Sequence, residues 1–576
     1  MRASKNQRTK NIIFLIIAVI IVGAYFYFNH GGVVAPKNSP ISGSESIVSV
    51  IVPHFDLYKD KRKELLKQVF DHYMPETVVV VSVDHFAAGT SGISTTDKEW
   101  DLTAGKVAAN KKLVSLLTES KIATSNEQAF GEEHGIKNIL PDIKELTRAN
   151  VLPIIIKDNV EKGEVDKLAD WIESNCKDCI VIASTDFSHY QPNALADIHD
   201  SYSISALEKL DFDKIWTAET DSPQSLYLAA KLAERNNTKN FNLFYNSNSG
   251  KLNNNDDAET TSVVLGYYSD KQVAEASQPS TSFVIAGDAM FDRNVWQRYN
   301  PDLKKVFDNF GTRVFRGSDV SLINLEGPVS DHAIPGIQTG GMSFNFQPQV
   351  PAVLKYLNIG EVSLANNHTN NAGTSGFATT KSMLSKSDII YFGKPSDYSQ
   401  DSVLRIPGQI PVTIIGIMAL DDFDQAGMNA KIKSEKSAGQ FVIIYPHWGE
   451  EYKEKHVSGQ SALAKEWIAA GADMIVGSHP HVTEDFELID GKPVVYSLGN
   501  FVFDQFFSQE TQEGLVLAGT ITKDKIQLTF LPTKEKLVKP EIVRGTDKTR
   551  RIKKILDVDS QIGFKKISSD TIEIKR

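Results

Sequence analysis

Cysteine is scarce in this chain, because Cys176 and Cys179 are the only two among 576 residues. A framework of disulfides is therefore excluded, and a zinc site built on cysteines would need a second pair. The two cysteines form a C-x-x-C spacing where a predicted helix meets a predicted strand, outside any thioredoxin-like sequence. A local disulfide and two free thiols both remain open.

An excess of basic residues is also absent. The chain has 62 Lys and Arg against 72 Asp and Glu, which gives a formal net charge of −10. Because proteins that bind nucleic acid carry a basic face, we expect no nucleic-acid partner. The apolar content of 41% and charged content of 23% are typical of globular protein. At about 150 residues per domain, the length predicts two or three domains.

One long hydrophobic run stands out, at residues 12–28. It is interrupted only by Gly23, ends in four aromatic residues and follows four basic residues between Arg2 and Lys10. The run is long enough to cross a bilayer, and its positive charges lie on the near side. We therefore predict a single-pass anchor in the cell membrane, with the N-terminus in the cytoplasm and the remainder extracytoplasmic. A cleaved signal peptide is the alternative.

The rest of the chain divides by composition and hydrophobic pattern. Two long stretches alternate short apolar runs with helix-like segments, which predicts two α/β domains. The segments between them are rich in Gly, Pro, Ser or Gln and have no apolar period, as linkers do. The predicted divisions are a basic end and anchor (1–28), a flexible stalk (29–46), a first domain (47–269), a linker (270–282), a second domain (283–534) and a basic tail (535–576).

In the second domain, strand-like runs end in side chains that can bind metals. Because ligands bind beyond the carboxyl ends of strands in α/β sheets, we expect these side chains to lie close together. Carboxylates with imidazoles suit Mn²⁺, Zn²⁺ or Fe²⁺, and two such cations would lie about 3.5–4 Å apart if a carboxylate bridges them. The candidates are Asp288, Asn324, Glu326, Asn367, His368, His447, His479 and His481.

These segments resemble the CapA family, the poly-γ-glutamate capsule synthesis proteins related to calcineurin-like metallophosphoesterases. The resemblance covers about residues 283–532 and implies a metallophosphoesterase-like α/β sandwich. The matching motifs are GDAM (287–290), NLEGP (324–328), ANNH (365–368), HWGEEY (447–452), GSHPH (477–481) and SLGNF (497–501).

The resemblance also implies roles for single residues. Asp288 and His481 would hold one cation, and Glu326 would bridge it to a second. The second cation would be held by Asn367, His447 and His479, with His368 facing the substrate as a general acid or charge stabiliser and Asn324 and Asn500 close by. At the first motif the related phosphoesterases have Asp-x-His, whereas this chain has Met290 at the third position.

The first domain resembles the Memo family, known in bacteria as AmmeMemoRadiSam system protein B. That family is related in fold to extradiol dioxygenases, which carry a metal on two histidines and a carboxylate. The resemblance implies a possible single metal at His54, His85 and His189, with Asp221 where the family has a cysteine. An active redox enzyme and a binding or degenerate domain both remain open. The matching segments are VPH (52–54), DH (84–85), EEHGIKNILP (132–141), STDFSHY (184–190), YNSNSG (245–250) and VVLGYY (263–268).

Together these resemblances predict a function in the biosynthesis or export of a capsule or surface polymer such as poly-γ-glutamate. The expected partners are the membrane, an anionic surface polymer or phosphoester substrate, and other capsule synthesis or export proteins. Two alternatives remain: a hydrolase of envelope phosphoesters, and a surface binding protein without catalysis.

Overall fold

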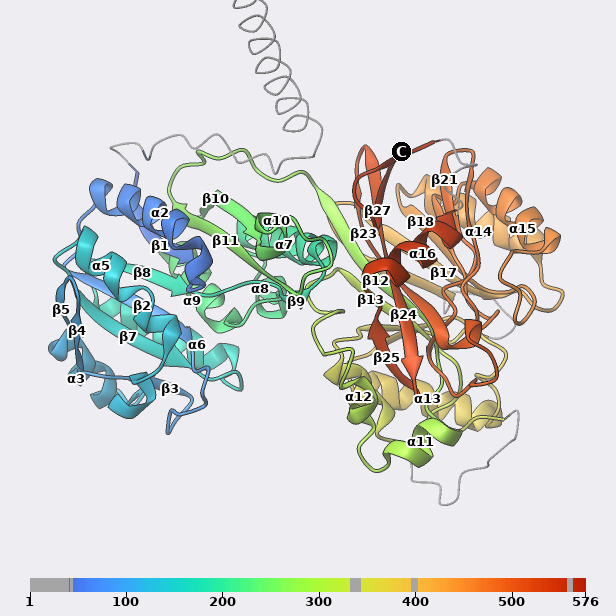
Figure 1. Cartoon of the computed structure of the whole chain (residues 1–576), viewed down its shortest axis with the longest axis horizontal. Helices are drawn as coiled ribbons and strands as arrows, with labels where there is room; N and C mark the ends of the chain where they lie inside the picture. The colour runs from blue at the N-terminus through green and yellow to red at the C-terminus, as the bar shows by residue number, and fades with distance from the viewer. Residues whose placement is uncertain (1–40, 42–44, 332–342, 395–401, 557–562) are drawn as a thin grey trace, which may run out of the picture.

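The computed structural model describes residues 41, 45–331, 343–394, 402–556 and 563–576. In Figure 1 the N-terminal half of the chain (blue to green) and the C-terminal half (light green through yellow to red) form two bodies that lie side by side. Each body mixes strands and helices, so the predicted α/β class is confirmed for both.

The N-terminal domain is built on one sheet with mostly parallel central strands. β1, β8, β2 and β7 run parallel, and β11 adds to β1 in the antiparallel direction. Every residue of β2 is buried, which is expected of a strand covered on both faces. The strand order is β10 (Asn240–Asn248), β11 (Thr260–Ser269), β1 (Ile47–Val52), β8 (Cys179–Ser184), β2 (Thr77–Val83), β7 (Asn150–Ile156), β3 (Ile93–Thr95) and β6 (Thr124–Ser125), with β9 (His189–Gln191) paired to β11.

Helices cover this sheet, and β4 (Glu99–Leu102) and β5 (Gly105–Ala108) form a separate hairpin. α9 contacts β1, β8 and β2 and packs against α6 and α8, while α2 packs against α5. α9 turns a continuous apolar stripe toward the sheet, including Leu226, Ala229 and Ala230. The helices are α2 (Lys59–His72), α3 (Lys111–Glu119), α4 (His134–Lys137), α5 (Leu140–Leu146), α6 (Lys162–Asn175), α7 (Asn193–Lys209), α8 (Phe212–Thr217), α9 (Pro223–Arg235) and α10 (Ser249–Leu252).

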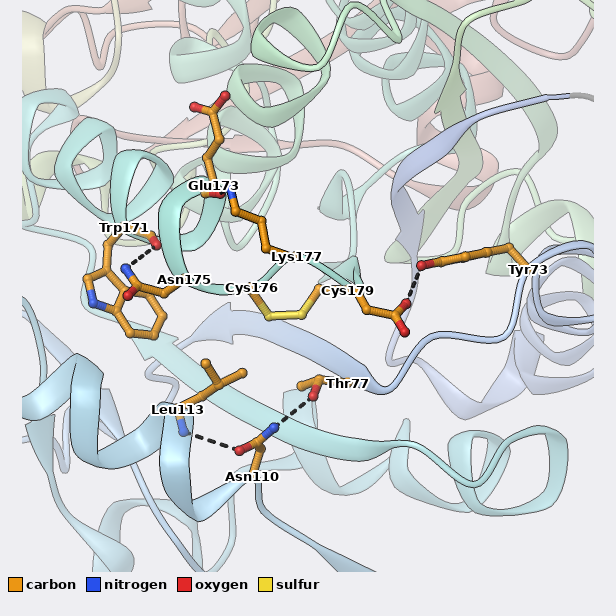
Figure 2. The surroundings of a disulfide bond; sticks show 11 residues. Tyr73, Thr77, Asn110, Leu113, Trp171, Glu173, Asn175, Cys176, Lys177 and Cys179 are labelled. Carbon is orange, nitrogen blue, oxygen red and sulfur yellow. Dashed lines mark hydrogen bonds between the residues drawn. A yellow bond between two sulfur atoms is a disulfide. The ribbon is translucent and has the colours of Figure 1, made fainter.

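Cys176 and Cys179 are joined by a disulfide at the turn from α6 into β8, as Figure 2 shows. The sequence leaves a disulfide and free thiols open, and the structure selects the disulfide. It closes a loop of sequence separation 3. It therefore fixes a local turn and no long-range framework.

The C-terminal domain is a sandwich of two sheets. The larger sheet has the order β15 (Ile390–Phe392), β14 (Glu361–Ser363), β13 (Val320–Leu325), β12 (Ser280–Ala289), β23 (Glu513–Thr522), β24 (Lys525–Lys536), β27 (Thr571–Lys575) and β26 (Phe564–Lys566), with β22 (Asn500–Val502) on β12 and β25 (Lys539–Ile542) on β24. The smaller sheet has the order β16 (Val403–Ile406), β17 (Val412–Met418), β18 (Phe441–His447), β19 (Met474–Val476), β21 (Lys492–Val495) and β20 (Phe486–Ile489).

Alternation along the strands builds three apolar layers. In β12, Phe283 and Ile285 enter the core between the sheets, while Val284 and Ala286 join the outer cluster under α11 and α12. In β18, Ile443 enters the core between the sheets, while Val442 and Ile444 join the outer cluster under α14 and α15. Because side chains of a strand alternate between its faces, one apolar run serves two layers. The helices are α11 (Arg293–Tyr299), α12 (Val350–Tyr356), α13 (Gly373–Lys386), α14 (Gln425–Ser437), α15 (Ser458–Ala470) and α16 (Gly545–Leu556).

The segment beyond residue 534, predicted as a basic tail, is part of this sandwich. β27 pairs with β24 from Lys525↔Lys575 to Thr529↔Thr571. α16 buries Ile552 in the core between the sheets. The sequence predicts a tail and not strands here because the strands are short and place charged residues between the buried ones. Their hydrophobic pattern is therefore weak.

The sequence predicts a membrane-spanning helix over residues 12–28, and the structure does not support it. That segment lies outside the described residues. Among the residues described, no helix combines the length and the apolar character that crossing a bilayer requires. The longest of those helices, α7, has 17 residues, which is short of the ~20 that span the hydrocarbon core. The transmembrane part of the predicted fold, the single-pass location and the membrane partner are therefore corrected and not carried further.

Candidate functional site

The parallel strands of both sheets in the C-terminal domain deliver polar side chains to one region. β12, β13 and β14 are parallel neighbours in the larger sheet, and β17, β18 and β19 are parallel neighbours in the smaller one. Asp288 near the end of β12 lies in register with Asn324 of β13. His447 is the last residue of β18 and forms a bridge to Ser478 after β19. The predicted convergence of strand ends is therefore present.

Asp288, Glu326 and His481 form the first group. Both carboxylates are fully buried, with 0% exposure. Asn324 Nδ2 lies between them and donates to Asp288 Oδ1 at 2.8 Å and to Glu326 Oε2 at 3.2 Å. His481 Nδ1 is 3.4 Å from Asp288 Oδ2, and its Nε2 is 3.6 Å from Glu326 Oε1. One ligand atom from each of the three residues lies within 4.8 Å of the others, which is close enough to hold one cation.

A second group lies beside the first. His447 Nε2 is 3.0 Å from Asn367 Oδ1, and its ring centroid is 4.7 Å from that of His479. Glu451 lies in the loop after β18. One ligand atom each from Glu451, His479 and His481 lie within 4.8 Å of one another. The structure thus brings the predicted His447 and His479 together. It adds Glu451, which lies within the same HWGEEY motif as His447 and was not among the predicted ligands.

The electrostatics of these groups call for a positive charge beside the two carboxylates, which a protonated His481 or a bound cation supplies. Burial and repulsion from Asp288 raise the pKa of Glu326 well above its usual value. Burial lowers the pKa of His481, but Glu326 and Asp288 outweigh it and raise that pKa to about 9. Burial, with repulsion from His481, lowers the pKa of His479 to about 4, so this imidazole is neutral and can coordinate a metal. Two adjoining buried carboxylates are costly without positive charge between them.

The backbone is strained where the two histidines of His-Pro-His lie. His479 has φ 101° and His481 has φ 58°, in the left-handed region that non-glycine residues avoid. Such strain costs on the order of 1–3 kcal/mol per residue and persists where surrounding contacts impose it. Here the His479 N–H donates to Asp288 Oδ2 at 3.2 Å, and His481 Nδ1 lies 3.0 Å from Asn500 Oδ1. The site therefore holds both histidines in place through its own carboxylate and amide groups.

His368 borders the first group without belonging to its ligand set. Its Nε2 is 3.9 Å from Glu326 Oε1, and its Nδ1 is 2.9 Å from Asn371 Oδ1. Its ring packs on Phe344 with a centroid distance of 4.2 Å. Burial lowers the pKa of His368, so the ring is neutral near pH 7. A neutral imidazole at the edge of a carboxylate site can accept or pass on a proton.

Met290, at the position where related phosphoesterases have a histidine, is not directed at a ligand. It is fully buried in the apolar cluster under α11 and α12, and its sulfur accepts the N–H of Asp292 at 3.0 Å. The imidazole of the first group comes from His481 alone.

Two buried atoms without hydrogen-bond partners give independent support for a divalent cation among these carboxylates and imidazoles. Glu326 Oε1 and His479 Nδ1 are buried atoms with no hydrogen-bond partner among the described residues. Buried polar atoms are nearly always paired, so two orphaned atoms in ligand groups that share His481 indicate an absent partner. Carboxylate and imidazole ligands suit Mn²⁺, Zn²⁺ and Fe²⁺.

The N-terminal domain has its own cluster, and the predicted residues meet there. Three imidazoles surround one oxygen, Asp221 Oδ2: the Nε2 atoms of His54, His85 and His189 lie 3.1, 3.6 and 3.9 Å from it. Burial raises the pKa of Asp221, but His54 outweighs it and holds that pKa well below its usual value. Asp221 is therefore the central carboxylate of this cluster.

Three further residues of the N-terminal cluster were not among the predicted ligands, although His134 is one of the histidines of the matching motifs. Asp186 Oδ2 is 3.3 Å from His54 Nε2, and Glu133 Oε1 is 2.6 Å from His85 Nδ1. His134 shares a ligand-atom group with His54 and His85. All three lie inside the quoted motifs EEHGIKNILP and STDFSHY, so carboxylates and imidazoles within the matching segments were the available signal.

The fold and these clusters define a two-domain α/β protein with a histidine–carboxylate site in each domain. Comparison with known proteins then gives the families. The family described as "Bacterial capsule synthesis protein PGA_cap" matches residues 282–505. The family described as "Memo-like protein" matches residues 33–264. The chain carries a Memo-like domain in its N-terminal half and a PGA_cap (CapA) domain in its C-terminal half.

Individual relatives agree with this assignment. The Capsule biosynthesis protein CapA of Bacillus anthracis is 29% identical over 329 residues, which is 51% of this chain and 77% of that protein. The PGA biosynthesis protein CapA of Bacillus subtilis is 30% identical over 255 residues, 41% of this chain and 66% of that protein. A MEMO1 family protein of Nitrosopumilus maritimus is 23% identical over 184 residues, 31% of this chain and 66% of that protein. The CapA-like domain suggests capsule biosynthesis.

Proposed function

We propose that the C-terminal domain binds two divalent cations and acts on an anionic polymer or phosphoester during the synthesis or export of a surface polymer such as poly-γ-glutamate. The observation that carries this proposal is the pair of orphaned buried atoms, Glu326 Oε1 and His479 Nδ1, inside a cluster of carboxylates and imidazoles. Bound cations would act there as Lewis acids toward an anionic oxygen.

The residues divide into distinct roles. Asp288, Glu326 and His481 would hold the first cation, and Glu326 would be shared with the second. Asn324 fixes both carboxylates through its two donated hydrogen bonds. The second cation would be held by Asn367, His447 and His479, with Glu451 as a further ligand.

His368 would supply the proton chemistry. Its Nδ1 contact with Asn371 orients the ring, and its Nε2 is directed toward Glu326 at 3.9 Å. A substrate oxygen bound beside Glu326 would therefore lie within reach of this imidazole, whose Nε2 could accept a proton from the attacking water and pass it to a leaving group.

The test of this function uses the full chain and a chromogenic phosphodiester. We expect hydrolysis in the presence of Mn²⁺, loss of hydrolysis after chelation, and recovery when Mn²⁺ is restored. The matched control is His456→Ala, because His456 lies outside both groups and contacts Asp485 at 3.1 Å instead. This variant should keep its activity.

Deletion of the gene separates the remaining alternatives. Loss of surface polymer on deletion supports the capsule function. Hydrolysis with unchanged polymer would instead indicate a phosphoester hydrolase outside capsule synthesis. Bound metal with neither hydrolysis nor polymer loss would leave a binding protein and contradict the proposed catalysis.

For the N-terminal domain we propose a single divalent cation held by His54, His85, His189 and Asp221. The observation that favours it is the convergence of three imidazoles on one carboxylate oxygen. Whether this domain also catalyses a reaction is a separate question from whether it binds a metal.

A further inference from the structure

A short segment of the C-terminal domain, residues 308–317, packs directly against the loops that form the N-terminal cluster. A cavity of about 700 Å³ lies between the two domains. His189, Tyr190 and Gln191 line it on one side, and residues 308–313 line it on the other. One of the predicted N-terminal ligands, His189, therefore borders the C-terminal domain.

Arg313 links this segment to His189 through one carboxylate. Arg313 Nη1 donates to Glu219 Oε1 at 2.9 Å, and the same oxygen accepts the backbone N–H of His189 at 3.2 Å. Glu219 is fully buried, with 0% exposure, and lies two residues before Asp221. The guanidinium from one domain thus neutralises a buried carboxylate that fixes the backbone of a ligand in the other.

A second contact ties the same two segments together. His199 of α7 lies 3.2 Å from the Val314 carbonyl through Nε2 and 2.9 Å from Ser188 Oγ through Nδ1. Because only a protonated nitrogen can donate to a carbonyl, Nε2 carries the proton, and Nδ1 accepts from the Ser188 hydroxyl. Ser188 precedes His189, so the C-terminal segment holds this loop at two adjacent points.

The approach of the segment depends on a glycine. Gly317 has φ +69°, and a Cβ at this position would lie 3.1 Å from both Cβ and N of Glu219. A side chain there would be strained and would push against the carboxylate's own backbone. The segment can therefore pack this closely against Glu219 because residue 317 is a glycine.

We propose that the C-terminal domain completes the N-terminal metal centre, with Arg313 as a positioning residue that fixes His189 through Glu219. This rests on the cation binding proposed above for the N-terminal domain. Without Arg313 the Glu219 carboxylate would lose the donor that holds Oε1 in place, and it would turn away from the loop. That change weakens its hold on the His189 N–H, and the ligand ring loses its fixed orientation.

The first test measures Mn²⁺ binding to the full chain, in a background carrying His447→Ala, His479→Ala and His481→Ala, which removes a ligand from each group of the C-terminal cluster. Arg313→Met should weaken Mn²⁺ binding at the N-terminal site by about 10–100-fold, the range seen when a partner that orients a ligand is lost. Arg313→Lys keeps a cation beside Glu219 and should recover most of the affinity.

The matched control is another interdomain contact. Gln409 Nε2 donates to Ser205 Oγ of α7 at 2.7 Å, and this contact does not touch residues 186–191 or 219–221. Gln409→Ala should leave Mn²⁺ affinity unchanged. Equal affinity in Arg313→Met and the parent protein would overturn the proposal.

A second readout needs no metal. Amide hydrogen exchange at residues 186–191 and 219–221 should be faster in Arg313→Met than in Gln409→Ala, because the His189 N–H has lost its fixed acceptor. If the parent protein binds no Mn²⁺ at this site, the metal proposal for the N-terminal domain fails, while faster exchange still supports the positioning role of Arg313. Unchanged exchange in Arg313→Met overturns that role in either case.

Discussion

The full-length protein carrying His479→Ala should lose the second of the two cations of its C-terminal domain, so that its metal content falls. His479 contributes a buried nitrogen without a hydrogen-bond partner among the described residues, and it lies between His447 and His481. Removing a direct ligand should weaken binding by well over the about 10–100-fold that is typical of orienting partners. Metal content per chain after dialysis, measured by elemental analysis, checks this.

His456→Ala provides the control for this experiment. His456 stacks on Tyr496 with a centroid distance of 3.9 Å and contacts Asp485, away from both ligand groups. It should retain the parent metal content. If His479→Ala keeps its metal as well, the cluster is a hydrogen-bonded structural feature and the proposed metal site is wrong.

His368→Ala should behave differently from His479→Ala: it should retain its metal and lose turnover. The imidazole borders Glu326 but lies outside the groups whose ligand atoms converge. Loss of a general acid or charge stabiliser lowers rates by about 10²–10⁴-fold. The rate of Mn²⁺-dependent phosphodiester hydrolysis and the metal content should be measured on the same preparation.

The comparison between the two variants separates ligand from proton donor. If His368→Ala loses metal as completely as His479→Ala, then His368 is a ligand and the assigned role is wrong. If His368→Ala keeps both metal and rate, the proton at the substrate comes from another group. Glu451 would then be replaced next, since its carboxylate lies within 4.8 Å of ligand nitrogens of His479 and His481.

Much of the C-terminal site could be predicted from the sequence because its geometry is local. Each ligand follows a short apolar run, and parallel strands bring such positions to one edge of a sheet. Asp288 and His447 both lie against Asn324, although 159 positions separate them in the chain. Glu451 was missed because its place depends on how the loop after β18 folds back, and a strand pattern does not specify that path.

The contact between the domains could not have been predicted in the same way. Arg313 and Glu219 are 94 positions apart and belong to different domains, and neither follows a strand with a distinctive motif. Their pairing depends on how two finished surfaces fit together. The same holds for the segment beyond residue 534, whose short charged strands acquire their place only by pairing with β24.

The measurement that tests the central claim most directly is anomalous X-ray diffraction from crystals of the full chain grown with Mn²⁺. The account predicts two peaks in the C-terminal domain, one among Asp288, Glu326 and His481 and one beside His447 and His479, about 3.5–4 Å apart. The absence of any anomalous peak within this cluster in the same crystals would contradict the account.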